Sequence, residues 1–292
     1  MPRDQEVLLF AFLAFLALIC CLPFVACQCN KNPVIFNFGD SNSDTGGYSA
    51  ALGFNFGYPD GRAFFHQPTG RLCDGRLVID FLCESLKTNY LTPYLDSLEP
   101  NFTNGVNFAI SGSATFPRYV PFSLDVQAIY LVGGKNFWVH NTGPLGCLPE
   151  KLGTRKTNAT DFDKYGCIKS MNDGAKAFNA ELDTLCQELR PQMKNATIVY
   201  VDMYSIKYDL IANSGAYGFK NPLMACCGYG GAPYNYNPDI KCRDRGYEVC
   251  EQELAYISWD GVHYTETANA MIASKILSTN YSPTPSWVQL LL

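Results

Sequence analysis

Histidine and charged residues are scarce in this sequence. It has three histidines in 292 residues, and 17% of its residues are Asp, Glu, Lys or Arg. No run of Lys or Arg occurs, and the formal net charge is −5. Phosphate contacts need clustered cations, so the composition argues against a nucleic-acid partner. Hydrophobic residues make up 47% of the chain, which predicts one large domain with a substantial core.

Long apolar runs are absent after residue 26. Residues 7–26 are almost wholly apolar, follow Arg3 and lead into small residues suited to signal peptidase. This pattern predicts a signal peptide over 1–27, one secreted domain over 28–292, and no stable membrane span after signal removal. An uncleaved membrane anchor is the alternative, because the run is slightly long for a signal and Asp4 and Glu6 weaken its positive start.

Cysteines and sequons also indicate export. Of thirteen cysteines, three fall in or at the end of the predicted signal, and the ten that remain permit complete pairing in an oxidising compartment. A zinc site is the alternative for the last four, although two are adjacent, C-x2-C spacing is missing and no histidine is near. These four are Cys226, Cys227, Cys242 and Cys250. The predicted glycosylation sites, which must lie on the surface if used, are Asn101, Asn158, Asn195 and Asn280.

Apolar, β-rich runs alternate with helical patterns along the chain. The runs that predict strands are 34–38, 106–110, 136–140 and 196–201. Helices are expected over 172–189, where apolar residues repeat every three or four positions, and over 265–277. This alternation predicts an α/β fold with a mainly parallel sheet and helices on both faces.

Three sequence-distant segments have reason to meet in such a fold, because reacting groups gather at the carboxyl ends of parallel strands. The first strand leads into Gly39-Asp-Ser-Asn42, and the second leads into Ser111-Gly-Ser-Ala-Thr115. The third segment, Asp260-Gly-Val-His263, precedes the final helix.

These segments contain the parts of a serine-nucleophile site. A serine hydroxyl needs a base, and that base needs an orienting group. Because His263 follows Asp260 by three residues, one short turn can present both side chains toward Ser41. His66 lies in a polar loop and His140 in an apolar strand, so His263 is the predicted base.

Each part also has a simpler interpretation. An isolated Gly-Asp-Ser is a common turn, and Asp40 and Asp44 can be turn or capping residues. Asp260-x-x-His263 alone can be a helix N-cap with a satisfied histidine. The co-occurrence of the segments, after a first strand and before a last helix, favours the catalytic interpretation.

Five stretches make the resemblance to a known family specific. The sequence resembles the plant GDSL esterase/lipase family of the SGNH hydrolases, and the resemblance covers nearly all of residues 28–292. No Gly-x-Ser-x-Gly elbow of an ordinary α/β-hydrolase occurs. The matching stretches are Phe38-Gly-Asp-Ser-Asn-Ser-Asp-Thr-Gly-Gly47, Phe65-His-Gln-Pro-Thr-Gly-Arg-Leu-Cys-Asp-Gly-Arg76, Gly105-Val-Asn-Phe-Ala-Ile-Ser-Gly-Ser-Ala-Thr115, Asn141-Thr-Gly-Pro-Leu-Gly-Cys-Leu-Pro149 and Trp259-Asp-Gly-Val-His-Tyr-Thr265.

The resemblance implies a flavodoxin-like three-layer α/β/α sandwich and a secreted serine ester hydrolase, extracellular or in the cell wall. It implies Ser41 as nucleophile through an acyl-Ser41 intermediate, His263 as base and Asp260 as its partner. No cofactor and no metal are expected, and the expected substrate is a small-molecule, polysaccharide or lipid ester. The backbone N–H groups of Ser41 and Gly112 would form the oxyanion hole.

The sequence departs from the family at one place. Relatives add an oxyanion-hole Asn from a third block, Gly-x-Asn-Asp, and this block does not occur in the chain. Up to residue 127 the sequence resembles the family just after its second block, and from residue 128 it resembles a segment beyond the third block. The strand and helices that surround the third block in relatives are therefore expected to be missing. Gly134-Lys-Asn136 is superficially similar, but its surroundings match a later connection. In strand order 2-1-3-4-5 the lost strand is central, which forces a gap or direct pairing of 34–38 with 136–140.

Two expectations follow from this departure. Residues 124–132 should form one helix that leads into the strand at 136–140. Activity should fall, since losing one oxyanion donor typically costs about 10²- to 10³-fold in kcat. A catalytically impaired secreted binding or vestigial isoform is therefore one alternative function. A glycosidase that uses carboxylates such as Asp44 and Asp260 is another.

Overall fold

The computed structural model describes residues 33–54, 56–96, 100–113, 122–251, 255–278 and 280–282. All of these belong to one unit, residues 33–292. The predicted signal peptide over 1–27 lies outside the described residues, as does Cys29. Among the described helices, none combines the length and the apolar character needed to cross a bilayer.

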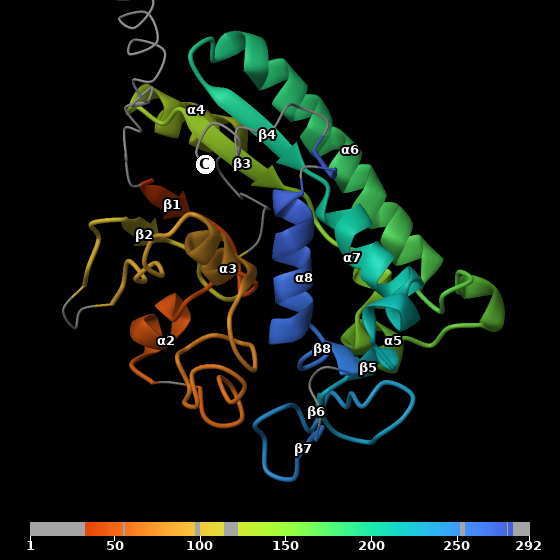
Figure 1. Cartoon of the computed structure of the whole chain (residues 1–292). Helices are drawn as coiled ribbons and strands as arrows, with labels where there is room; N and C mark the ends of the chain where they lie inside the picture. Colours follow the sequence, from red (N-terminus) through yellow and green to blue (C-terminus); the bar gives the residue numbers. More distant parts are fainter. Residues whose placement is uncertain are drawn as a thin grey trace, which may run out of the picture. The chain divides into compact units, whose positions relative to one another are not determined.

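Three pairs of parallel strands form the framework (Figure 1). They are β1 (Ile35–Asn37) with β2 (Gly105–Asn107), β3 (Asn136–His140) with β4 (Thr197–Val201), and β5 (Asn221–Ala225) with β8 (Tyr256–Ser258). The short strands β6 (Cys227–Gly228) and β7 (Glu248–Val249) pair antiparallel. All four strands expected from the sequence are present, and the predicted α/β class with mainly parallel strands is confirmed.

The sheet is interrupted between β1 and β3. Across the described residues, β1 pairs only with β2 and β3 pairs only with β4 among the strands, so β1 and β3 do not pair with each other. Of the two arrangements expected for a chain without the central strand, the structure therefore has the gap. No described strand supplies hydrogen bonds to both β1 and β3, so the parallel strands lie in separate pairs rather than in one continuous sheet. The predicted connecting helix is present as α4 (Phe122–Leu131).

Two helices match the sequence patterns closely. The pattern at 172–189 lies within α6 (Lys169–Gln192), whose Cys186 and Leu189 pack with Ile198 of β4 in a buried cluster. The last helix is α8 (Glu266–Leu277), and its N-cap is Thr265, whose Oγ1 accepts the N–H of Ala268 at 3.2 Å.

The remaining helices surround α8 or lie in connections. Helix α8 contacts α3 and α7, and Ile272 of α8 packs with Ile206 and Leu210 of α7 in the largest buried cluster. The other helices are α2 (Gly47–Leu52), α3 (Val78–Ser85), α5 (Pro149–Thr154) and α7 (Met203–Ala212), with 3-10 turns η1 (Leu145–Cys147), η2 (Ala159–Asp161) and η3 (Ser214–Tyr217).

Six of the nine described cysteines form disulfides, so the pairing is less complete than the sequence permits. The bonds are Cys147–Cys167, Cys226–Cys250 and Cys227–Cys242. The zinc interpretation of the last four cysteines is therefore wrong. Cys73, Cys83 and Cys186 remain buried thiols. Burial raises the pKa of Cys83 to about 12 and that of Cys186 to about 11, which keeps them in the unreactive thiol form.

All four predicted glycosylation sites are exposed, as their use would require. The asparagine at position 101 accepts hydrogen bonds from the N–H and hydroxyl of Thr103 at 3.1 and 2.6 Å. Their modification stays a prediction.

The interruption leaves apolar side chains in solvent. Phe36 on β1 is 58% exposed and Phe38 just after it is 56% exposed. Leu131 and Val132, where α4 ends, are 81% and 87% exposed. A strand edge with free backbone groups beside large apolar side chains is a template for association with another chain.

Replacing Phe36 with lysine should therefore slow aggregation. The charge opposes edge-to-edge pairing, while the free energy of unfolding should change by less than about 0.5 kcal/mol because the side chain is already exposed. Light scattering during incubation measures the first effect and urea unfolding the second. Leu52→Lys, at a similarly exposed position (53%) on α2, is the matched control. Equal slowing by both variants would contradict a role for the β1 edge.

Candidate functional site

Ser41 lies in a turn directly after β1, as the sequence predicts. The turn is closed by Asp40, whose Oδ1 accepts the N–H of Asn42 at 2.8 Å and whose carbonyl accepts the N–H of Ser43 at 3.1 Å. The serine itself is half-buried. This arrangement leaves Ser41 at the carboxyl end of a parallel strand, where substrates bind in folds of this class.

Asp44 joins the first block to the second. It is 1% exposed, and its oxygens accept the N–H groups of residues 46–48 at the start of α2, at 2.5 to 3.1 Å. They also accept the N–H and Oγ–H of Ser111 at 2.7 and 3.0 Å. Gly112 follows with a left-handed φ of 86°, which glycine tolerates best. The capping interpretation of Asp44 is confirmed, and both of its oxygens are occupied.

Two amides, half-buried Asn37 and buried Asn107, hold the two strands below these loops. Asn37 Nδ2 donates to Asn107 Oδ1 at 2.7 Å, and Asn107 Nδ2 donates to the carbonyl of Ser43 at 2.7 Å and to Thr45 Oγ1 at 2.9 Å. Asn107 is 1% exposed. Buried amides need such partners, so the ladder fixes the Ser41 loop relative to the second block.

Asp260 and His263 form the hydrogen-bonded pair that their spacing predicts. His263 Nδ1 lies 2.7 Å from Asp260 Oδ2, and Asp260 Oδ1 accepts the N–H groups of Val262 and His263 at 3.1 and 2.9 Å. Asp260 is 9% exposed and His263 is 8% exposed. The facing imidazole and the Arg243 cation hold the pKa of the Asp260 carboxyl far below its usual range, against the effect of burial. Asp260 is therefore an anion that can orient the ring.

The turn between β8 and α8 presents this pair. Gly261 adopts a φ of 98°, its N–H donates to Ser258 Oγ at 3.0 Å, and its carbonyl accepts the N–H of Glu150 at 3.1 Å. Since Thr265 is the N-cap of α8, the interpretation of Asp260-x-x-His263 as an N-cap is wrong.

The structure does not join Ser41 to His263. The buried Nε2 of His263 has no hydrogen-bond partner in the part of the chain that the structure describes. A closed triad would place the serine hydroxyl at this atom. The serine loop follows β1 and the histidine turn follows β8, and these strands belong to separate pairs. Of the two hydrogen bonds that a closed triad needs, the described structure therefore shows the one between Asp260 and His263.

The other two histidines lack a comparable carboxylate partner in the described structure. His66 is exposed, and its Nδ1 lies 3.2 Å from the carbonyl oxygen of Arg62. His140 reaches solvent at the end of β3, yet the protein around its ring and the charge of Lys207 lower its pKa to about 4. The choice of His263 as the base agrees with these environments.

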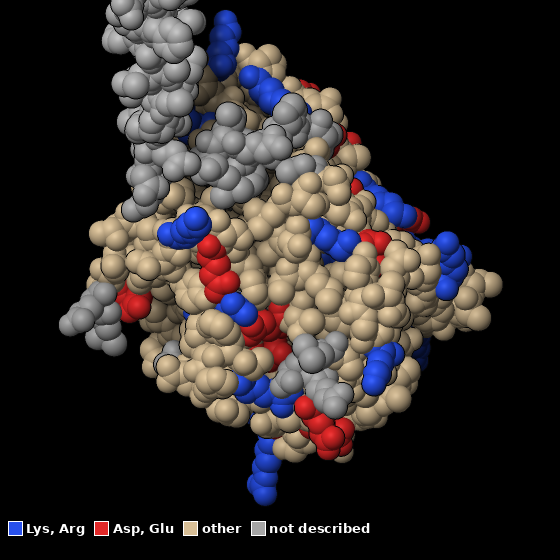
Figure 2. Space-filling model, in the orientation of Figure 1, with Lys and Arg blue, Asp and Glu red and all other residues tan. Residues whose placement is uncertain are grey.

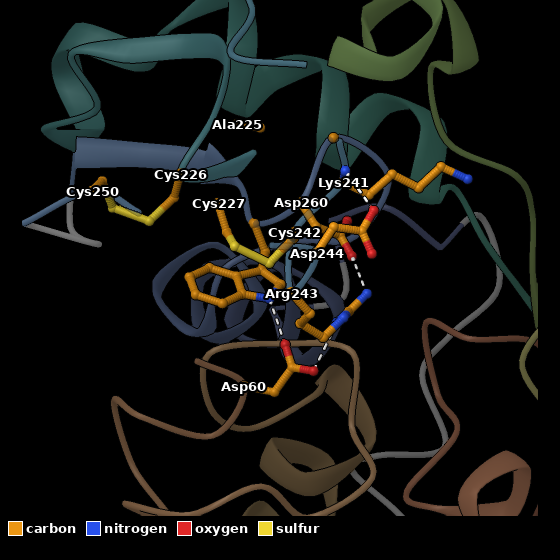
Figure 3. Close-up of a disulfide and its surroundings, with 12 residues drawn as sticks. Asp60, Ala225, Cys226, Cys227, Lys241, Cys242, Arg243, Asp244, Cys250 and Asp260 are labelled. Carbon is orange, nitrogen blue, oxygen red and sulfur yellow. Dashed lines mark hydrogen bonds and ion pairs between the residues drawn. A yellow bond between two sulfur atoms is a disulfide. The ribbon is translucent and has the colours of Figure 1, made fainter. Parts of the chain in front are cut away.

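Three charged residues around the candidate site were not predicted from the sequence. Asp60 is fully buried and accepts hydrogen bonds from Arg243 Nη1 at 2.7 Å and from the indole of Trp259 at 2.9 Å (Figure 3). Lys207 of α7 is 9% exposed and places its Nζ 4.2 Å from the ring centre of Tyr264. No local pattern signals these residues, since their partners are distant in sequence.

Asp60 should make stability depend on pH. Burial raises its pKa from 3.8 to about 6, so the folded protein binds this proton more tightly than the unfolded chain. The Asp60 contribution to stability is therefore present below about pH 4 and is lost as the pH rises through about 6. Asp60→Asn should remove this loss, which urea unfolding from pH 4 to 7 would measure. Exposed Asp239→Asn is the control, and identical pH profiles for wild type and Asp60→Asn would contradict the assignment.

Comparisons with known proteins place the chain among plant enzymes. The family model described as GDSL-like lipase/acylhydrolase matches residues 35–126 and 117–276. The chain is 47% identical over 339 positions to "GDSL esterase/lipase LIP-4" of Arabidopsis thaliana, covering 90% of each protein. It is 35% identical to "GDSL esterase/lipase ACHE" of Zea mays, covering 87% of each. It is also 38% identical to "Alpha-L-fucosidase 3" of Arabidopsis thaliana, covering 85% of this chain and 91% of that protein. The chain belongs to the GDSL-like lipase/acylhydrolase family.

Proposed function

We propose that the protein is a carboxylic ester hydrolase that uses Ser41 as nucleophile, His263 as general base and Asp260 as its orienting group. The observation that carries this proposal is the 2.7 Å contact between Asp260 and His263 Nδ1, beside a buried Nε2 that has no hydrogen-bond partner among the described residues. A neutral imidazole held this way can accept a hydroxyl proton. Family membership and the esterase names of close relatives support the same chemistry.

The reaction would proceed in two halves. Ser41 Oγ approaches His263 Nε2, transfers its proton and attacks the ester carbonyl, while the N–H groups of Ser41 and Gly112 stabilise the oxyanion. The leaving alcohol takes the proton from His263, and water then releases the acid from acyl-Ser41 through the same base. The described structure has no hydrogen bond between Ser41 Oγ and His263 Nε2, so the first step requires that contact to form.

We propose that an internal segment carrying the third family block is absent near residues 127–128. Two observations support this. The two matches to the family model overlap at 117–126, beside the proposed junction. The alignment to the first Arabidopsis relative spans 339 positions, whereas 90% of this chain is about 263 residues. The chain would then lack one oxyanion donor, with turnover reduced by about 10²- to 10³-fold.

A catalytically impaired, secreted binding or vestigial isoform is the second candidate. Within the described ranges, the separate strand pairs and the absence of a hydrogen bond between Ser41 and His263 Nε2 favour it. A glycosidase is less well supported, although one relative is named as a fucosidase. A glycosidase mechanism would need the Asp44 carboxyl group as a free acid or base. That carboxylate already accepts hydrogen bonds from five donors.

Secretion, to the extracellular space or cell wall, is part of this proposal. Three disulfides and four exposed sequons support an oxidising compartment. The proposed substrate class is an ester of a small molecule, polysaccharide or lipid, and hydrolysis by this route needs no cofactor.

A fluorophosphonate probe should label the wild-type protein at Ser41. Labelling should disappear in Ser41→Ala and persist in Ser43→Ala, a neighbouring serine in the same loop. In-gel fluorescence measures the label, and circular dichroism checks the fold. Correctly folded wild type that takes no label would refute the esterase and favour the impaired isoform.

The three histidines should differ in their effect on turnover. His263→Ala should abolish hydrolysis of a short p-nitrophenyl ester, with a loss of about 10³-fold or more, because Ser41 loses its base. His66→Ala and His140→Ala should lose much less, since neither ring is paired with a carboxylate in the described structure. Initial rates at neutral pH measure this, and similar losses in all three would argue against the assignment.

A further inference from the structure

Arg243 lies between two buried carboxylates at the candidate site. Its Nη1 is 2.7 Å from Asp60 Oδ2, and its Nη2 is 3.6 Å from Asp260 Oδ2 (Figure 3). The first distance is a charge-assisted hydrogen bond, and the second is an ion pair without one. Asp60 is 0% exposed and Asp260 is 9% exposed, so water screens neither charge well.

The backbone holds Arg243 in place at a conformational cost. Its φ of 80° is left-handed, a conformation that residues with a side chain rarely adopt. The preceding Cys242 is bonded to Cys227, whose N–H donates to the carbonyl of Trp259 at 2.7 Å. The disulfide therefore ties the arginine loop to the turn that carries the catalytic pair. Backbone strain that the surrounding structure maintains is found mostly at functional sites, so the left-handed Arg243 beside the Asp260–His263 turn indicates a functional role for its side chain.

The charges explain what that role can be. Asp260 Oδ1 is satisfied by two backbone N–H groups and Oδ2 by His263, so Arg243 adds no hydrogen bond to Asp260. It adds the positive charge that offsets two buried anions. Without that charge, Asp60 and Asp260 would repel each other, and the imidazolium of His263 would face uncompensated negative charge.

We propose that Arg243 is a positioning residue for the Asp260–His263 pair, acting as the counter-charge between Asp60 and Asp260 that keeps the Asp260 carboxylate aligned with His263. The proposal deepens the proposed esterase function and rests on it for its catalytic meaning. Several elements contribute the ionisable groups that face the turn at 259–264. They are Asp60, Arg62, Glu150 of α5, Lys207 of α7, Tyr236, Arg243 and Asp260.

Proton NMR of the imidazole signals tests this without substrate. The chain has three histidines, so His66→Gln and His140→Gln identify the His263 signal. Arg243→Met should raise the titration midpoint of His263 by about one pH unit, because a nearby cation is lost. Arg243→Lys, which keeps the charge, should shift it by less than about 0.3 unit. Exposed Arg245→Met, two residues away, is the matched control and should leave it unchanged.

A double variant guards against misfolding. Arg243→Met alone leaves Asp60 buried with one partner fewer, whereas Asp60→Asn with Arg243→Met removes that charge as well. The midpoint should still rise in the double variant, although less. An unchanged midpoint in both variants would overturn the proposal, and so would an equal rise in Arg245→Met.

The same variants distinguish the positioning role of Arg243 from the esterase activity itself. In an ester assay, the acid limb of kcat/KM against pH should move upward with the NMR midpoint. A purely structural role would lower activity equally at all pH values, which would overturn the proposal. A shifted midpoint in a protein without turnover would count against the esterase alone.

Discussion

Interior strands of a parallel sheet need a hydrogen-bonding neighbour on both edges, and β1 has a named strand on one edge only in the described structure. Much of what distinguishes this chain follows from that constraint. Phe36 and Phe38 stand in solvent, and β3 begins a second, separate pair. The Ser41 loop at the end of β1 is therefore not linked through one continuous sheet to the turn that holds His263.

Polar contacts outside the sheet join the two halves of the site. Asp60 reaches Arg243 and Trp259, and Arg76 forms a 2.5 Å ion pair with Glu266 at the start of α8. Asp74 accepts the N–H of Glu266 at 2.7 Å. Buried or half-buried ionic contacts of this kind are costly to break, since each leaves a charge without a partner. They keep the segment after Ser41 against the C-terminal turn even though strand pairing does not.

Local sequence predicted a structural element correctly where one short segment contains all the residues that determine that element. The four expected strands, the helix within α6 and the start of α8 at Thr265 each follow from periodicity or capping over a few residues. The Asp260–His263 pair also follows, because three residues in a turn determine its geometry. Disulfide connectivity did not follow, since several pairings of the same cysteines satisfy the sequence equally.

The sequence by itself determined the family, which the comparisons confirm. The catalytic residues and the missing central strand that it also indicates remain proposals. Only the tertiary structure decided that β1 and β3 stay apart rather than pair, and that Cys73, Cys83 and Cys186 stay reduced. It also placed Arg243 between two carboxylates, one of them 183 residues away. The physical reason is that charge compensation in a buried site depends on proximity in space, and sequence patterns report only neighbours within a strand, turn or helix.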